Sequence, residues 1–304
     1  MDAAGTADAE APALLRRRRP WPCVMVRAVG PDDKGKKASG SAFYSRKDGR
    51  TSVSGSGILF RIHGGTADAD APPLVLTSGH LLAHFLRFAR GRRPELRKGC
   101  RLAVRFPTAS SNGAASTATV GNDWVPASLA AVAEVPGTAA AAGRLLRWPQ
   151  PARAGVTVGH VAILRLRAQP PPPPTECNCG AFSLCTPPYP PAPRLGQRVA
   201  LVSSPFGLVF PRVFENTLAC GVVSTLAGPS LLLTDAPACA GAEGGALVCV
   251  RSGALVAVAA PRLVRRGGEA LELSAAIPAA ALGPAVAAAL SCDDADSDPR
   301  RSKL

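Results

Sequence analysis

Residues 231–248 read LLLTDAPACAGAEGGALV, and this stretch says most about the fold. One apolar run ends at Thr234, a loop of small residues follows, and a second apolar run begins after a pair of glycines. Glycine adopts backbone conformations that other residues avoid. The pattern predicts two short strands joined by a sharp turn around Gly241 and the Gly244-Gly245 pair.

Short apolar and β-branched runs separated by turn residues recur on both sides of this stretch, a pattern typical of antiparallel β proteins. Six runs lie in the first part of the chain: Val24 to Val29, Ser56 to Ile62, Leu74 to Ser78, Arg101 to Phe106, Ser128 to Val135 and His160 to Leu166. Six more follow: Gln197 to Ser204, Phe214 to Leu226, Ser230 to Ala236, Gly245 to Val250, Ala254 to Arg262 and Leu271 to Ile277.

The two sets of strands are separated by a proline-rich segment, which we expect to be a linker because proline cannot donate to a β ladder. An Ala-rich segment, Pro278 to Leu290, predicts a C-terminal helix. We therefore expect an all-β fold of two antiparallel barrels followed by a helix, although strand counting alone leaves a sandwich open. The predicted parts are a disordered N-terminus (1–22), a first barrel (23–168), the linker (169–195), a second barrel with the helix (196–290) and a flexible tail (291–304), with low-complexity loops at 107–125 and 136–156.

The composition narrows the classes of function. The 304 residues include 35 Lys and Arg against 21 Asp and Glu, a net charge of +14 that attracts polyanions. The arginines are scattered among Ala, Pro and Gly, and few aromatic residues are present to stack on bases, which argues against a nucleic-acid partner. An alternative remains that the arginines between Arg87 and Arg105 hold nucleic acid or an acidic partner.

Membrane and cofactor binding are also disfavoured. No stretch is apolar enough to cross a bilayer, and the first twenty residues do not have the pattern of a secretory signal. The nine cysteines are an odd number at irregular spacings, so we expect free thiols. Cys177, Cys179 and Cys185 lack the spacing and the nearby histidine of a zinc site, and we expect neither a metal nor a cofactor.

The turn around Glu243 resembles the nucleophile segment TDAxxxPGNSGGxL of the HtrA/Deg-type trypsin-like serine proteases. Thr234 and Asp235 fall on the family's TD without a gap, and Glu243 falls on the nucleophilic serine. Three other segments are similar to family motifs in the same order: GSGI at 55–58, VLTSGH at 75–80 and SSPFGL at 203–208.

A closer resemblance is to the peroxisomal or glyoxysomal leader-peptide processing proteases, whose long chains carry two trypsin-like halves, the first of them degenerate. The chain resembles this degenerate N-terminal half, and the residues that carry the resemblance are Phe206, Gly207, Phe214, Asn216, Thr217, Leu218, Cys220, Gly221 and Val222, followed by Glu243. The likeness covers roughly residues 50–290 and implies a chymotrypsin-like double six-stranded β-barrel.

This resemblance also assigns the catalytic positions. His80 is the retained base, His160 stands where the family has its aspartate, and Glu243 stands in place of the serine, while the oxyanion hole would use the backbone of Gly241 and Glu243. Removing the nucleophile of a triad costs on the order of a millionfold in rate, and replacing the acid about ten-thousandfold. We therefore expect a pseudoprotease, in which the Glu243 carboxylate reaches toward His80 and favours its imidazolium form.

Two other routes to chemistry stay open at this point. Cys239, four residues before Glu243, is a candidate for a displaced thiol nucleophile with His80 as base, so a serine- or thiol-type endopeptidase remains an alternative. In HLLAHFLRFA, His84 follows His80 by one predicted helical turn and suggests a metal pair, but no third ligand is evident.

The tripeptide Ser302-Lys303-Leu304 is the signal that a peroxisomal import receptor reads at a free C-terminus, and it predicts a location in the peroxisome matrix. The expected partners are this receptor, presequence peptides, and a catalytic protease half or a second copy of the chain. The implied role is regulation of presequence processing.

Overall fold

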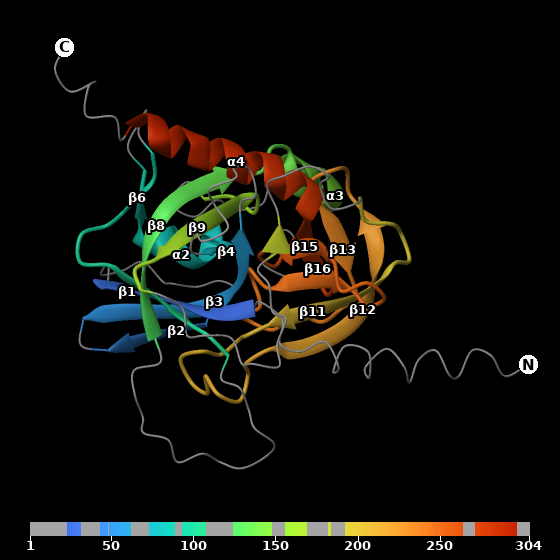
Figure 1. Ribbon diagram of the computed structural model, residues 1–304. Helices are drawn as coiled ribbons and strands as arrows, with labels where there is room; N and C mark the ends of the chain where they lie inside the picture. Colours follow the sequence, from blue (N-terminus) through green and yellow to red (C-terminus); the bar gives the residue numbers. More distant parts are fainter. Residues whose placement is uncertain are drawn as a thin grey trace, which may run out of the picture.

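A computed structural model describes residues 23–31, 43–47, 49–61, 73–88, 93–107, 124–147, 156–168, 182–183, 192–263 and 271–296 of the chain (Figure 1). The N-terminal segment, most of the proline-rich linker with Cys177, Cys179 and Cys185, and the tripeptide 302–304 lie outside these residues. Within them, no helix is long and apolar enough to cross a membrane.

The first barrel consists of β1 (Cys23–Pro31), β7 (Arg101–Arg105), β8 (Trp124–Glu134), β9 (His160–Leu166), β4 (Leu74–Ser78) and β3 (Arg50–Arg61), paired in that order. Pairing of β3 with β1 closes the ring, and every pair in it is antiparallel. Two strands lie off the ring: β2 (Phe43–Lys47) pairs with β3, and β10 (Phe182–Ser183) pairs in parallel with the end of β3. Closure leaves no edge of the six-stranded ring unpaired.

The second barrel is a closed ring of β11 (Arg198–Ser203), β12 (Thr217–Leu226), β13 (Leu232–Thr234), β16 (Ser274–Pro278), β15 (Leu255–Ala259) and β14 (Ala246–Cys249). All of its pairs are antiparallel. Its interior is filled by small and branched side chains such as Val199, Val223 and Leu232. Together with the first barrel, this ring confirms the chymotrypsin-like double barrel predicted from the sequence.

Helix α4 (Ala279–Asp296) runs over both barrels (Figure 1). It packs on β8 of the first barrel and on β15 and β16 of the second. Leu282 and Val286 are fully buried in the largest apolar cluster, which joins side chains of both barrels with α3 and α4. The interface between the barrels is therefore itself a hydrophobic core.

All twelve predicted strands occur, with shifts at their ends, but one predicted loop is wrong. Within residues 136–156, taken as a low-complexity insertion, α3 (Thr138–Leu146) forms a helix of two turns. Its sequence TAAAAGRLL has high helix propensity, and Ala141 and Ala142 are buried. The Thr138 hydroxyl shares its proton between the carbonyls of Val135 at 3.0 Å and Ser230 at 3.2 Å, so the helix also links the barrels.

Candidate functional site

His80 follows β4 in the first barrel. The strand ends at Ser78, and His80 lies in the single-turn helix α2 (Gly79–Leu82). The hydroxyl of Ser78 caps this helix by accepting a hydrogen bond from the backbone N–H of His80 at 3.2 Å. The cap fixes the direction in which the chain leaves the barrel, and His80 is half-buried there.

His160 lies beside His80 because β4 and β9 are neighbours. Ser78 pairs with Val161, which brings the first residue of β9 next to the start of α2. The approach is close: a Cβ on Gly79 would lie 2.8 Å from both the Cβ and the carbonyl oxygen of His160. Only glycine fits at 79, and the positions of the family's base and acid are adjacent.

The hydrogen bonds of His160 differ from those of a triad aspartate. Its Nδ1 accepts a hydrogen bond from the backbone N–H of Thr157 at 3.0 Å and lies 2.9 Å from the Thr157 hydroxyl. Burial lowers the pKa of His160, and the nearby Glu134 carboxylate opposes this shift. A neutral imidazole that accepts a hydrogen bond at Nδ1 carries its proton on Nε2. The Nε2 of His160 can therefore donate a hydrogen bond but cannot accept one. An aspartate in a triad must accept from the base, and His160 in this state cannot.

Glu243 lies in the turn between β13 and β14, and the turn reaches the first barrel. Gly241 and Gly244 have φ angles of 90° and 86°, which other residues rarely adopt. A Cβ on Gly244 would lie 2.8 Å from the Thr77 hydroxyl and 3.0 Å from the backbone nitrogen of Ser78. The turn that carries Glu243 therefore packs against the end of β4, two residues before His80.

The Glu243 carboxylate folds back on its own turn. Its Oε2 accepts a hydrogen bond from the backbone N–H of Gly241 at 2.9 Å, and the residue is only 6% exposed. The sequence analysis predicted this N–H as an oxyanion-hole donor, a group that stabilises charge as it develops on a substrate carbonyl. In the structure the N–H donates to the Glu243 carboxylate.

Ser56 holds the turn in place, and the sequence analysis did not single it out. It is fully buried in β3, where its hydroxyl donates to the Gly241 carbonyl at 2.8 Å and accepts from the Ser204 backbone N–H at 2.9 Å. The backbone N–H of Ser56 also donates to the Glu243 carbonyl at 3.2 Å. The only sequence signal for this role was its place in the GSGI motif.

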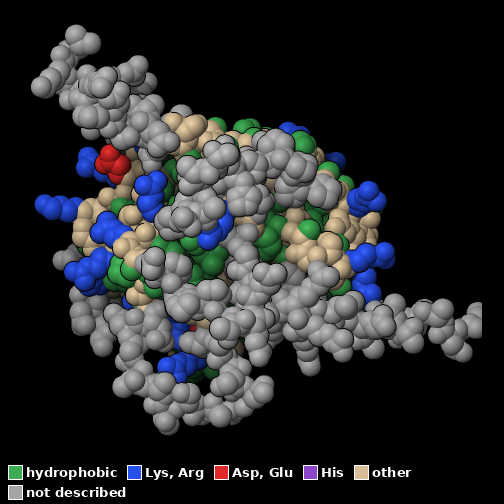
Figure 2. All heavy atoms as spheres, viewed as in Figure 1, with side chains coloured by type: hydrophobic (Ala, Val, Ile, Leu, Met, Phe, Trp, Pro, Cys, Tyr) green, Lys and Arg blue, Asp and Glu red, His purple; other side chains and the backbone are tan. Residues whose placement is uncertain are grey.

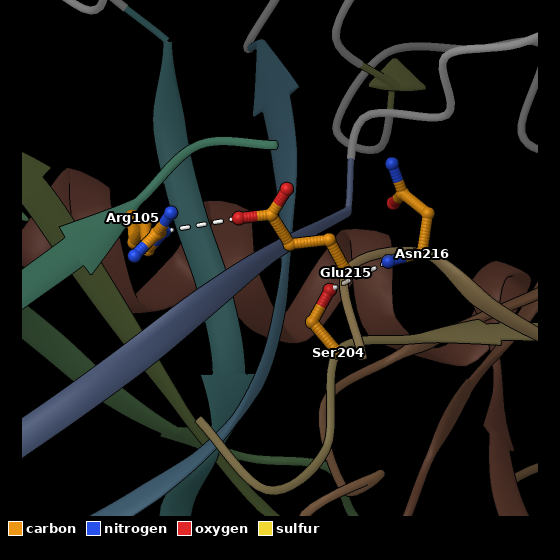
Figure 3. Close-up of polar contacts among 4 residues, drawn as sticks. All are labelled: Arg105, Ser204, Glu215 and Asn216. Atoms are coloured by element: carbon orange, nitrogen blue, oxygen red, sulfur yellow. Dashed lines mark hydrogen bonds and ion pairs between the residues drawn. The ribbon is translucent and has the colours of Figure 1, made fainter. Parts of the chain in front are cut away.

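A nearly buried ion pair joins the barrels close to this turn. Arg105 on β7 donates from Nε to Glu215 Oε1 at 3.0 Å, and the two side chains are 6% and 10% exposed (Figure 3). The next residue, Asn216, has a φ of 51° and donates its backbone N–H to the Ser204 hydroxyl at 3.1 Å. Sequence reasoning placed Asn216 in a motif but missed the ion pair, because no local pattern connects positions 110 residues apart.

The remaining candidate residues are placed as follows. His84 lies in the 3₁₀ turn η1 (Ala83–Phe85), which follows α2 directly, and its ring packs edge-on against Phe85 at 5.3 Å. Cys239 is an exposed free thiol. Among the described residues, no group of three potential ligands could hold a metal ion. Contact between the side chains of Glu243 and His80 stays a prediction.

Two closed six-stranded antiparallel barrels with a C-terminal helix define the fold class as that of the chymotrypsin-like serine proteases. Comparison with known proteins bears out the resemblance read from the sequence. A peroxisomal leader peptide-processing protease of Homo sapiens is 48% identical over 75 residues, 24% of this chain and 13% of that protein. The Mus musculus protein of the same name is 44% identical over 88 residues, 29% of this chain and 15% of that protein. The matched stretches thus span about a seventh of these relatives.

Other comparisons are less specific. No family model matches the chain. Similar solved structures include a serine endoprotease from Yersinia pestis, with a TM-score of 0.46 and 16% identity, covering 92% of this chain and 66% of that one. The HtrA-type protease AlgW with decapeptide has a TM-score of 0.44 and 16% identity, covering 88% of this chain and 63% of that one.

Proposed function

We propose that this chain is a peroxisomal pseudoprotease of the trypsin-like fold, which takes part in processing imported proteins by binding and not by cleaving. The observation that carries the proposal is the Glu243 carboxylate at the nucleophile position, turned back onto the Gly241 N–H. A carboxylate in this place offers no hydroxyl for acyl transfer, and it competes with a substrate carbonyl for the anion-hole donor.

The state of His160 supports the same proposal. With Nδ1 accepting from Thr157, His160 supplies no acceptor to fix the tautomer of a neighbouring base. Two of the three catalytic functions are thus missing, and restoring one alone leaves the other absent. A fold that keeps its motif turns without this chemistry retains surfaces suited to binding.

The partners we propose are presequence peptides and either a catalytic trypsin-like half or a second copy of this chain. The location and the process rest on the names of the partial relatives and on Ser302-Lys303-Leu304, which lies outside the described residues. An import receptor that reads this tripeptide would bring the chain to the peroxisome matrix.

A cleavage assay tests the central claim. The purified chain should not cleave presequence peptides above buffer background, and a fluorophosphonate probe should not label it. Added to an active peroxisomal processing protease, the chain should change that enzyme's rate on the same peptides. Turnover that is lost in His80→Ala would instead establish the endopeptidase alternative, and iodoacetamide inactivation that is abolished by Cys239→Ser would identify its nucleophile.

Localisation is tested separately. A fluorescent reporter fused before the chain should enter peroxisomes, and deletion of Leu304 should leave it in the cytosol. Import that is unchanged by the deletion would contradict the proposed role of the tripeptide.

A further inference from the structure

An open hollow of about 1350 Å³ lies on the first barrel, away from the catalytic positions. Its floor is formed by β1, β7 and β8, and one wall by residues 93–96, which include β6 (Glu95–Leu96). None of His80, His160 and Glu243 lines it. A ligand bound in this hollow would therefore not contact the residues on which the proposed function rests.

The hollow is strongly cationic. One acidic side chain, Glu95, lines it, together with five arginines: Arg27, Arg50, Arg93, Arg101 and Arg167. The lining thus carries a net charge of +4, from five positive and one negative group. Figure 2 shows Lys and Arg exposed along this flank of the molecule with little acid among them.

Arg27 is held in the floor in a way that leaves it short of hydrogen-bond partners. Its guanidinium lies over the Trp124 ring at 4.3 Å from the ring centre. Its Nε is buried and has no hydrogen-bond partner among the described residues. Burial lowers the pKa of Arg27, which reflects the cost of removing this cation from water. An incoming carboxylate would pair with the part of the guanidinium that faces the hollow and so offset this cost.

The side chains that line the hollow favour an acidic peptide over single-stranded nucleic acid as the anionic ligand. Single-stranded nucleic acid is held by stacking its bases on open aromatic faces. Trp124 is the single Phe, Tyr or Trp in the lining, and Arg27 already covers one face of its ring. The rest of the apolar lining is aliphatic, with Pro94, Leu96 and Leu129, and suits the stems of peptide side chains.

We propose that this hollow, which we call the arginine hollow, binds an extended acidic peptide segment of a partner protein. Carboxylates of the segment pair with the guanidinium groups, and its side-chain stems lie along the aliphatic wall. The site gives the chain a binding surface separate from the predicted catalytic positions His80, His160 and Glu243.

Fluorescence anisotropy with a labelled peptide of alternating Glu and Ala, about twelve residues long, tests the proposal at near-physiological salt. The chain should bind this peptide and not the Gln-Ala peptide of the same length. Arg101→Gln with Arg167→Gln, both exposed positions, should weaken binding by about tenfold or more. Arg27→Lys keeps the charge, loses the planar stacking, and should also weaken binding.

The matched control removes the same charge elsewhere. Arg251→Gln with Arg262→Gln, exposed on the second barrel, should change the affinity less than about twofold. An equal loss in this control would overturn the proposal in favour of unspecific attraction, as would no binding of the Glu-Ala peptide at all. If an oligothymidine of equal charge bound more tightly than the Glu-Ala peptide, and the Arg101→Gln, Arg167→Gln variant lost that binding, the hollow would be a nucleic-acid site instead. Binding that arises only after removal of the aspartate-containing segment 292–304 would show that the chain's own tail occupies the hollow.

Discussion

Glu243 differs from serine in two ways that matter for the turn. It carries a carboxylate in place of a hydroxyl, and it is long enough to accept a hydrogen bond from the backbone N–H of Gly241, two residues earlier. A serine side chain at this position would leave that N–H free for a substrate. On the proposed function, Glu243 therefore offers no nucleophilic hydroxyl and fills part of the predicted anion hole at once.

Restoring the serine alone should not restore activity. In Glu243→Ser the donor at Gly241 is released, but His160 still accepts from Thr157 and cannot orient the base. We expect no fluorophosphonate labelling of this variant above background, because loss of the triad acid alone costs about ten-thousandfold. The double variant Glu243→Ser with His160→Asp should label measurably faster. Fast labelling of the single variant would show that another group serves as the acid.

His160 should make stability depend on pH. Because burial lowers its pKa in the folded state below 6.5, the unfolded chain binds the proton more readily. The stability linked to the neutral ring is present above that pH and is lost as pH falls through the unfolded pKa toward the folded one. Urea unfolding between about pH 7.5 and 5.5 should show a steeper loss for the native chain than for His160→Gln. Equal slopes would contradict this role of the ring.

At the scale of elements, periodicity and turn residues predicted every strand of both barrel rings but not the smaller pieces. Strands β5 (Leu86–Arg87) and β6 are two residues each, too short to produce a pattern. Helix α3 was missed because the low-complexity, Ala-rich composition of residues 136–156 was interpreted as a loop insertion. Its packing depends on the second barrel, through Thr138 and Ser230.

Motif spacing predicted the positions of the site residues, but it could not predict their hydrogen bonds. The close contact of Gly79 with His160 follows from the pairing of β4 with β9, which the family motifs imply. The direction of the Glu243 side chain depends on the φ of Gly241 and on the nearby Ser56 anchor. Both are tertiary features, because Ser56 lies 185 residues before Gly241.

Helix α4 is expected to hold the barrels together through its buried face. Leu282 is fully buried in the cluster shared by both barrels, whereas Ala288 on the same helix is exposed. Leu282→Ala should lower the free energy of unfolding by about 3 kcal/mol, from lost burial and the cavity left behind. Ala288→Ser should cost less than about 1 kcal/mol. Chemical denaturation measures both, and similar costs would mean that α4 is dispensable.

At the scale of the whole molecule, the barrels meet through apolar packing and a few buried polar links. Cys23 belongs to the apolar contact between the barrels: it is fully buried, and its thiol lies 3.5 Å from the Val202 carbonyl oxygen. Burial raises the pKa of this thiol to about 12. Ser56 and Thr138 supply hydroxyl links. The Arg105–Glu215 ion pair is a charged link, and its contribution to the free energy of unfolding differs from that of the hydroxyl links.

A buried ion pair is costly to break but adds little net stability, because removing both charges from water offsets most of their attraction. Glu215→Leu and Arg105→Met should each lower the free energy of unfolding by about 3 kcal/mol, since each breaks the ion pair at a nearly buried site. The double variant, apolar on both sides, should be near the native stability. Arg101→Met, exposed on the same strand, is the matched control and should stay within about 0.5 kcal/mol. A double-mutant cycle by urea denaturation measures the coupling. If the single losses simply added in the double variant, the two charges would not depend on each other, and apolar packing with the hydroxyl links would be what joins the barrels.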